Sequence, residues 1–265
     1  MKLAMYSVMG ELNVICMKWG TAFGPEYVNR LYRGVRRHLH GDLRFICVTD
    51  DRSDIRPEVE IVDYKPEPFE NELAAALAVS PRRGKMKKIT MQKPGLVPDL
   101  VGPLLSLDID VVVTGPLDDL YSYAPGKICM RRVWAKPSRL VGLGEGSACR
   151  FDPAIHSYLY EDIARDPSGC VAKASGSEQS YISWSAFDHG DFSPFPDEWC
   201  VSFKYDCRPR RPMNLFQSPR LPSDARLIFF HGKPKMAEAV NGYRADPFHS
   251  TRRAEWLSDA WKEDE

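Results

Sequence analysis

Two aspartates, Asp108 and Asp110, directly follow an apolar run in the stretch GPLLSLDIDVVVTGPLDDLY, residues 102–121. On an extended chain, residues i and i+2 lie on the same side, so both carboxylates can face one object. Carboxylates this close repel each other unless a positive charge lies between them. Hard oxygen ligands at this spacing suit Mg²⁺ or Mn²⁺. The motif therefore predicts a divalent-cation site, and the simpler alternative is a strand cap beside a solvated aspartate.

The elements that must position these carboxylates are predicted from the pattern of apolar residues. Short β-rich runs alternate with helical patterns, which is typical of a mostly parallel sheet covered by helices. In such a sheet ligands bind beyond the carboxyl ends of the strands, where we expect both aspartates. For the first half we predict strands at 12–19, 43–51, 59–64 and 103–115, a helix at 25–39, and a weaker helix at 84–97.

The second half of the chain is less regular. We predict strands at 126–131, 146–151, 198–205 and 225–232, and helices at 153–164, 178–187 and 251–265. Neither an internal repeat nor a long linker interrupts the pattern. The sequence therefore predicts a single α/β domain over residues 1–265.

The composition excludes several classes of protein. Of the 265 residues, 43% are hydrophobic and 27% are charged, which predicts a soluble globular protein with a full core. The 36 basic residues balance 36 acidic ones, so no overall positive field favours nucleic acid. The seven cysteines lie mostly in apolar runs without C-x-x-C spacing, which predicts reduced core thiols in a cytosolic protein. The first residues are interpreted as mature protein and not as a signal peptide.

Five blocks between residues 13 and 236 occur in a characteristic order: VICMKWGTAFGPEYVNRLYRGVRRHL, RFICVTDD, LLSLDIDVVVTGPLDDL, SEQSYIS and IFFHGKPK. They resemble the blocks of nucleotide-sugar glycosyltransferases of the GT-A fold, in particular glycosyltransferase family 8 and its bacterial relatives. The resemblance implies a Rossmann-like, mostly parallel central sheet flanked by helices. It also implies a nucleotide-sugar-binding half at 1–120 and a smaller acceptor-side half at 121–265.

The resemblance assigns a metal site and a phosphate contact. Asp108 and Asp110 become ligands of Mn²⁺ (or Mg²⁺), and His231 becomes the third protein ligand. His231 follows a predicted strand, and neutral imidazole suits Mn²⁺, although a histidine in this place is more often structural. A lysine after the histidine contacts the diphosphate in the family, and the shortened spacing here leaves Lys233 and Lys235 as alternatives.

The nucleoside, by the same resemblance, is held by the first strand and its loop, which contain Met17, Lys18, Trp19 and Tyr27. One of the two aromatic rings could stack on the base, with core packing as the alternative. Asp50, at the end of the second predicted strand, could accept hydrogen bonds from base or ribose, or cap a turn. Lys88 leans over the phosphates in the family, whereas the plain interpretation of KMKK is a solvated surface.

The acceptor side depends on the block SEQS, residues 177–180. In the family, an acid that binds sugar hydroxyls is followed by a glutamine beneath the anomeric carbon, which assigns Glu178 and Gln179 as catalytic residues. The family's third residue is aspartate, but this chain has Ser180. Glu178 could also be a first-turn acid that only favours the helix dipole.

The predicted function is that of a metal-dependent, hexosyltransferase-type glycosyltransferase of polysaccharide biosynthesis in the cytoplasm. It moves a sugar from a nucleotide-sugar donor, by resemblance a UDP-sugar, to a hydroxyl of a glycan or lipid-linked acceptor, with retention. One rival hypothesis is an inactive sugar-nucleotide-binding or scaffold protein. Another is a sugar nucleotidyltransferase or a D-x-D phosphatase, which the missing glycine-rich loop and the order of the acidic motifs disfavour.

A basic loop, RPRRP at 208–212, raises the question of a membrane. It could contact anionic lipid or an acidic glycan, with a solvated loop as the alternative. If the acceptor is lipid-linked, peripheral attachment at the inner membrane face fits this loop. Because the chain contains no sufficiently long apolar stretch, we predict no membrane span.

Overall fold

The computed structural model describes residues 12–134, 143–245 and 250–262. The N-terminal residues interpreted as mature protein, 1–11, and the last three residues of the predicted C-terminal helix lie outside the described residues. None of the described helices has the length and apolarity that crossing a membrane requires. All seven cysteines are described and are free, as predicted.

A seven-stranded sheet, in the order β3-β2-β1-β4-β7-β6-β8, forms the centre of the fold. The neighbours β3, β2, β1 and β4 are parallel, β7 runs antiparallel to both β4 and β6, and β8 is parallel to β6. The predicted mostly parallel α/β sheet is thus confirmed. The strand bounds are β1 Leu12–Lys18, β2 Leu43–Thr49, β3 Glu60–Asp63, β4 Leu104–Leu107, β6 Ile128–Arg132, β7 Gly144–Phe151 and β8 Phe192–Pro194.

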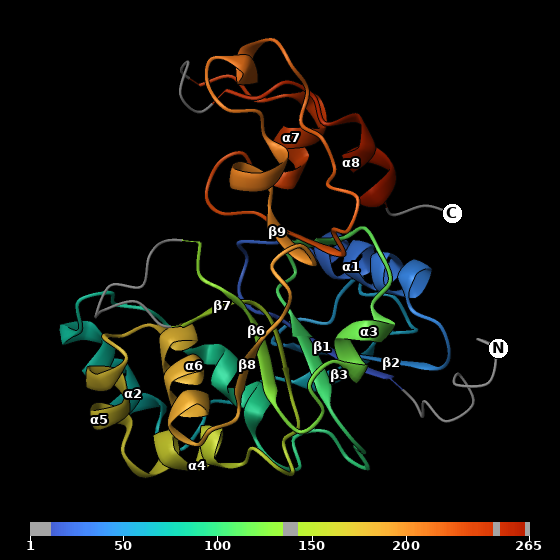
Figure 1. The fold of residues 1–265 in the computed structure, drawn as a ribbon. Coiled ribbons are helices and arrows are strands. Elements are labelled where there is room, and N and C mark those ends of the chain that lie inside the picture. The colour runs from blue at the N-terminus through green and yellow to red at the C-terminus, as the bar shows by residue number, and fades with distance from the viewer. Residues whose placement is uncertain (1–11, 135–142, 246–249, 263–265) are drawn as a thin grey trace.

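Helices cover both faces of this sheet (Figure 1). On β1, Val14 and Cys16 pack on one face and Ile15 and Met17 on the other, because successive side chains alternate. Continuous apolar strands such as this one need cover on both sides. The first face is covered by α1 (Pro25–His38) and α3 (Asp118–Ser122), and the second by α2 (Glu70–Val79), α4 (Tyr158–Arg165), α5 (Pro167–Lys173) and α6 (Glu178–Asp188).

The predicted strand at 103–115 is wrong in one respect, because the chain turns within it. β4 ends at Leu107, and β5 (Val111–Val113) belongs to a second sheet, in which it pairs antiparallel with β10 (Leu227–Phe229). β10 also pairs, in parallel, with β9 (Cys200–Ser202). The Val111 N–H donates to the Asp108 carbonyl at 3.1 Å and closes the intervening turn. The D-x-D motif therefore lies where the chain passes from one sheet to the other.

The C-terminal region, described at 200–245 and 250–262, packs beyond one end of the central sheet around a core that also includes Val112 of β5 (Figure 1). Phe203 stacks on Phe230 with ring centroids 4.8 Å apart, and Leu257 is fully buried beside them. After β9 the region contains a π-helical turn at Phe203–Cys207, a 3₁₀ turn η3 at Met213–Leu215, and the helices α7 (Met236–Asn241) and α8 (Glu255–Ala260).

The helix predicted at 251–265 begins at Glu255 and ends at Ala260, and two further predicted elements differ from the structure. The weak helix at 84–97 is a short 3₁₀ helix, η1 (Lys87–Gln92), since Met86 before it has a left-handed φ of 41° and Pro94 follows. The strand predicted at 198–205 ends at Ser202, where the Ser202 hydroxyl accepts from the Tyr205 N–H at 3.3 Å and starts the π-helical turn. At η1 and at the end of β9, the chain turns although the apolar pattern of the sequence continues.

Candidate functional site

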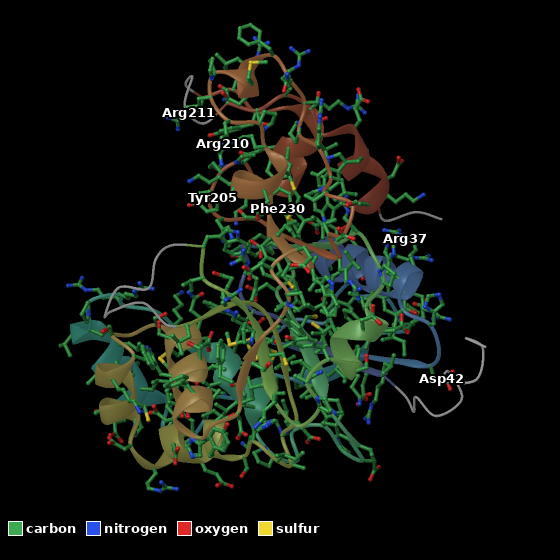
Figure 2. The ribbon with its side chains drawn as sticks, viewed as in Figure 1. Arg37, Asp42, Tyr205, Arg210, Arg211 and Phe230 are labelled. Atoms are coloured by element: carbon green, nitrogen blue, oxygen red, sulfur yellow. The ribbon has the colours of Figure 1, made fainter. Side chains whose placement is uncertain are left out.

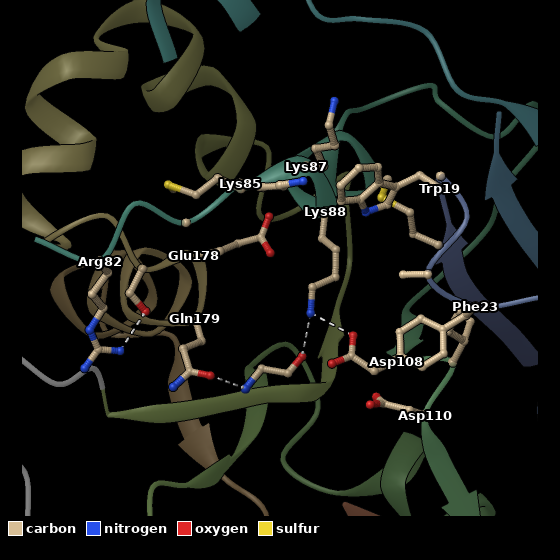
Figure 3. A pocket seen from close by; sticks show the side chains of 18 of the residues that line it. Trp19, Phe23, Arg82, Lys85, Lys87, Lys88, Asp108, Asp110, Glu178 and Gln179 are labelled. Atoms are coloured by element: carbon tan, nitrogen blue, oxygen red, sulfur yellow. Dashed lines mark hydrogen bonds and ion pairs between the residues drawn. The ribbon is translucent and has the colours of Figure 1, made fainter. Parts of the chain in front are cut away.

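A cavity of about 780 Å³ opens at the carboxyl ends of β1 and β4 (Figure 3). Because β1 and β4 are parallel and adjacent, their carboxyl ends meet at this edge. Trp19 and Phe23 lie at the end of the cavity that holds the two aspartates, and Arg82 and Gln179 lie at the opposite end (Figure 3). The lining comes from the end of β1 with its loop, the segment 82–88, the turn 108–110, the start of β7 at 145–146, and residues 176–179.

Both aspartates of the D-x-D turn line the cavity, and each is paired with a lysine. Lys88 Nζ donates to Asp108 Oδ1 at 2.7 Å and to the Gly146 carbonyl at 3.2 Å. Lys235 Nζ donates to Asp110 Oδ2 at 3.0 Å. Since 108–110 is a turn, this geometry, and not the alternation of a strand, aims both carboxylates at one space.

The pKa shifts of Asp110 and Lys88 reflect the negative charges that lie close together at this turn. Burial raises the pKa of Asp110 above its ordinary value, and the charge of Asp108 raises it further, against the opposing effect of Lys235. Burial alone would lower the pKa of Lys88, but Asp108 and Glu178 outweigh it, so that this pKa is raised. Lys88 is therefore a permanent ammonium group at neutral pH. The ammonium groups of Lys88 and Lys235 therefore offset part of the negative charge of the two aspartates.

The D-x-D turn offers the hard oxygen donors that Mg²⁺ or Mn²⁺ prefers, open to water and to substrate phosphate. Within the described residues, however, no group of three or more His, Cys, Asp or Glu side chains is arranged to hold a metal ion. His231 is not among the residues lining the cavity; its ring packs edge-on against Trp134, with centroids 4.8 Å apart. Its Nε2 is buried and finds no hydrogen-bond partner in the described part of the chain. An unsatisfied imidazole nitrogen fits a ligand role, so the predicted ligand set stays a prediction.

Glu178 and Gln179 both line the cavity, from the first turn of α6. Glu178 Oε1 accepts from the Ile89 N–H at 3.1 Å, and burial raises the pKa of Glu178 while Lys88 opposes the shift. Gln179 Oε1 accepts from the Gly146 N–H at 3.3 Å, which ties α6 to β7. Glu178 and Gln179 therefore line the same cavity as the D-x-D turn, and their chemical roles stay predictions.

Of the predicted nucleoside-binding residues, Met17 and Trp19 line the cavity. The ammonium groups of Lys85 and Lys87 lie 4.4 Å and 5.4 Å from the centre of the Trp19 ring. These cation–π contacts hold the indole against the segment 82–88. Trp19 is thereby fixed as a wall of the cavity.

Three other residues that were predicted to bind the nucleoside do not line the cavity. Lys18 is buried, and its Nζ donates to the Asp51 carbonyl at 3.4 Å. Asp50 accepts from the Gly20 N–H at 2.9 Å and so shapes the first loop. Tyr27 packs between Phe23 and Trp261. Their positions support the loop from outside the cavity lining.

The two lysines that follow His231 have different partners. Lys233 forms an ion pair with Glu238, and its side chain is 56% exposed. Lys235 reaches Asp110, as described above. Of the two alternatives that the sequence left open, Lys235 is the one that reaches the D-x-D turn, and the phosphate contact stays a prediction.

Several lining residues were not predicted from the sequence, among them Phe23, Arg82, Lys85, Lys87, Glu145, Gly146 and Ser177. Lys85 and Lys87 belong to the basic cluster around Lys88, which was a usable signal. No local signal marked Arg82, because it reaches the cavity only through the contact between two loops that are far apart in the sequence.

That contact is made by two glycines, Gly84 and Gly176. A Cβ on Gly84 would lie 2.4 Å from the Gly176 carbonyl oxygen, and a Cβ on Gly176 would lie 2.1 Å from Ser80 Oγ. Gly176 also has a φ of +75°, in the left-handed region. The segment 82–88 can therefore approach the start of α6 only where both side chains are absent.

We expect Gly176→Ala to lower the free energy of unfolding by about 2–4 kcal/mol, because it adds a steric clash to left-handed strain. The matched control is Gly190→Ala, with a φ of +73° and no atom within 4 Å of its Cβ. The control should cost about 1–2 kcal/mol, from strain alone. Urea denaturation of both variants measures the difference, and equal losses would contradict the close approach.

Comparison with known proteins gives a fold but no sequence family. No protein-family model and no curated protein sequence matches the chain. The structure is similar to that of mouse xyloside xylosyltransferase 1, with a TM-score of 0.53 and 12% identity over 85% of this chain and 98% of that one. It is also similar to the galactosyltransferase LgtC in complex with donor and acceptor sugar analogues, with a TM-score of 0.57 and 12% identity over 94% and 95% of the two chains.

A third similar structure is the glycosyltransferase GlyE of Streptococcus pneumoniae TIGR4. Its TM-score is 0.57 at 14% identity, and the match covers 94% of this chain but 60% of GlyE. All three similar proteins are glycosyltransferases. Because the sequence identities are so low, the similarity shows a shared fold and nothing more. The fold implied by the sequence resemblance is confirmed: the chain has the fold of the GT-A glycosyltransferases.

Proposed function

We propose that this protein is a glycosyltransferase that moves a sugar from a nucleoside-diphosphate donor to a hydroxyl of a glycan or glycolipid acceptor. The observation that carries the proposal is the D-x-D turn, whose two carboxylates line one cavity and are each paired with a lysine. A diphosphate leaving group needs its charge neutralised as the sugar departs, and this turn gathers groups that do so. The shared fold supports the same proposal.

The donor occupies the end of the cavity that holds Trp19 and Phe23. One of these rings offers the flat apolar surface that a base needs, and the uridine nucleotides are the first candidates by the sequence resemblance. The diphosphate would then lie over the D-x-D turn. Each lysine there has three N–H donors, so Lys88 and Lys235 can keep a carboxylate and still donate to phosphate oxygens.

The cation of the proposal is Mn²⁺ or Mg²⁺, held by Asp108 and Asp110, with His231 as the third protein ligand. When bound, it would act as a Lewis acid on the diphosphate. Lys235 orients Asp110 through the 3.0 Å ion pair, and Lys88 orients Asp108. These two contacts fix the turn before any substrate arrives.

The transferred sugar, a hexose in this proposal, lies toward Glu178 and Gln179. A structure of LgtC with an active-site glutamine replaced by glutamate is among the similar ones, which supports a role for a glutamine in this cavity. Gln179 would face the anomeric carbon and Glu178 would accept hydrogen bonds from sugar hydroxyls. The raised pKa of Glu178 follows from burial. Retention of the anomeric configuration is part of the proposal.

The test is thermal unfolding of the full chain with UDP, GDP, ADP and CDP, each with and without Mn²⁺. One nucleotide should raise the Tm, because a ligand present at 100 times its Kd stabilises the folded state by about 2.7 kcal/mol. Sugar transfer is then measured with the donors of that base. If no nucleotide raises the Tm under any condition, the donor site is refuted; binding without turnover would instead favour the inactive sugar-nucleotide-binding protein.

A further inference from the structure

A second surface, far from the cavity, combines exposed apolar side chains with arginines. Met213, Leu215, Phe216 and Leu221 are 41%, 39%, 68% and 37% exposed. Nine large hydrophobic residues are exposed in the described part of the chain, and these four fall within nine consecutive positions. Scattered single exposures need no explanation, but a cluster of this kind marks an interaction surface.

The same segment is strongly basic although the whole chain has no net charge. Residues 208–221 contain Arg208, Arg210, Arg211 and Arg220 and not one aspartate or glutamate. The apolar side chains of η3 are therefore embedded in a local positive field. Charge of this density acts over about 8–10 Å at physiological salt.

A second stretch of chain brings more arginines to the same place. A cavity of about 770 Å³ is lined by Arg244, Arg252 and Arg253, all exposed, together with Leu215 of η3. Asn214 Nδ2 donates to the Ser250 carbonyl at 2.8 Å, and this buried bond joins the two stretches. The basic-apolar surface is thus one unit, formed by Met213, Leu215, Phe216, Arg210, Arg244, Arg252 and Arg253.

Its backbone is held in place by hydrogen bonds. Tyr243 and Thr251 form an antiparallel bridge with N–H to carbonyl distances of 2.9 Å and 2.8 Å. The Gln217 N–H donates to the Met213 carbonyl at 2.8 Å, which closes the turn after η3. The exposed apolar side chains are therefore presented by an ordered turn.

The basic-apolar surface is separate from the donor cavity. The two cavities share no lining residue. Figure 2 shows Arg210 and Arg211 on the C-terminal region, well away from the central sheet.

We infer that the basic-apolar surface docks this protein on a membrane with anionic headgroups. Phe216, Met213 and Leu215 enter the interface between headgroups and acyl chains, and the arginines bind headgroup phosphates while their stems cover apolar surface. An acidic glycan would use the arginines but would leave the apolar turn in water. A neutral protein partner would use the turn but not the arginines. An anionic membrane uses both.

The test is co-sedimentation of the full chain with vesicles of phosphatidylcholine, with and without phosphatidylglycerol. We expect binding to the anionic vesicles only, and release at high salt. Phe216→Ser, and separately Arg252→Ala combined with Arg253→Ala, should each weaken the vesicle partition coefficient by about ten-fold or more. All variants are first checked for an unchanged Tm.

Matched controls come from exposed residues elsewhere. Phe187, 56% exposed on α6, gives Phe187→Ser, and Arg165, with a 73% exposed side chain on α4, gives Arg165→Ala. Both should bind vesicles as the wild type does. The inference is overturned if the wild type does not bind anionic vesicles, or if the control variants weaken binding equally. It is also overturned if the arginine variant loses binding while Phe216→Ser keeps it, because that result means anion binding without insertion. No outcome depends on glycosyl transfer, so this proposal and the proposed function fail independently.

Discussion

Asp110→Asn should lower kcat/KM for sugar transfer by about a thousand-fold while the protein stays folded. The substitution keeps the shape of the side chain but removes the charge that holds Lys235 at 3.0 Å. In the proposed mechanism it also removes a ligand of the cation, so two positive groups lose their anchor beside the diphosphate. Steady-state kinetics over a range of Mn²⁺ concentrations, with nucleotide affinity from calorimetry, measure the effect.

The matched control for this variant is Asp63→Asn. Asp63 also lies at the carboxyl end of a strand of the central sheet, but its side chain is 61% exposed and pairs with Arg52. Its replacement should leave kcat/KM within about two-fold of the wild type, because exposed ion pairs contribute little. Activity of Asp110→Asn that is equally close to wild type would contradict the site.

Lys235→Met separates the two roles of Asp110. If Asp110 acts only through its ion pair, adding Asp110→Asn to Lys235→Met costs no further activity. If Asp110 also binds the cation, the added substitution lowers activity further and raises the Mn²⁺ concentration needed for half-maximal binding of nucleotide. The double-mutant cycle therefore tests the metal proposal by a binding measurement as well as by activity.

Arg150→Met should lower the free energy of unfolding by about 3–5 kcal/mol, the largest stability effect we expect. Arg150 lies on β7 and is only 2% exposed. Its guanidinium donates to the carbonyls of Leu120 and Tyr121 at 2.8 Å, of Ala124 at 2.7 Å and of Lys127 at 3.1 Å. Methionine would fill much of the space but would donate to none of these carbonyls, of which that of Ala124 would keep the Lys127 N–H at 3.2 Å.

Arg132→Met is the control, since Arg132 lies on the neighbouring strand β6 with a 61% exposed side chain paired to Asp197. It should cost less than about 1 kcal/mol. Arg150→Lys keeps the charge but offers fewer donors and should fall between the two. Urea denaturation gives all three values; a loss below about 1 kcal/mol for Arg150→Met would show that water replaces the guanidinium.

Much of the fold could be predicted from local pattern. The run LNVICMK is mostly apolar and buried throughout because β1 is covered on both faces, and Pro25 starts α1 where the pattern changes to helical spacing. The turn at 108–110 could not be predicted, because neither Gly nor Pro interrupts it and both β4 and β5 are buried. An apolar pattern reports burial and not the sheet to which a strand belongs.

The site was predicted in part for a related reason. Residues next to each other on a strand face opposite ways, so Met17 lines the cavity while Lys18 points behind it, which the alternation of β1 already implied. The opposite end of the cavity depends on Gly84 meeting Gly176, across more than ninety positions of sequence. No local motif records such a contact. The chemical roles of the residues that meet in the cavity stay predictions.

The pairing of β5 limits how this chain can be divided. Val111, Val112 and Val113 precede most of the C-terminal half in sequence, yet their ladder partners are Phe229, Ile228 and Leu227 of β10. A fragment that stopped before β10 would leave a buried apolar strand with an open edge, which is a template for aggregation. β10, more than a hundred positions after β5, therefore completes the sheet beside the D-x-D turn. A ribosome must synthesise the chain beyond Phe229 before this sheet can form.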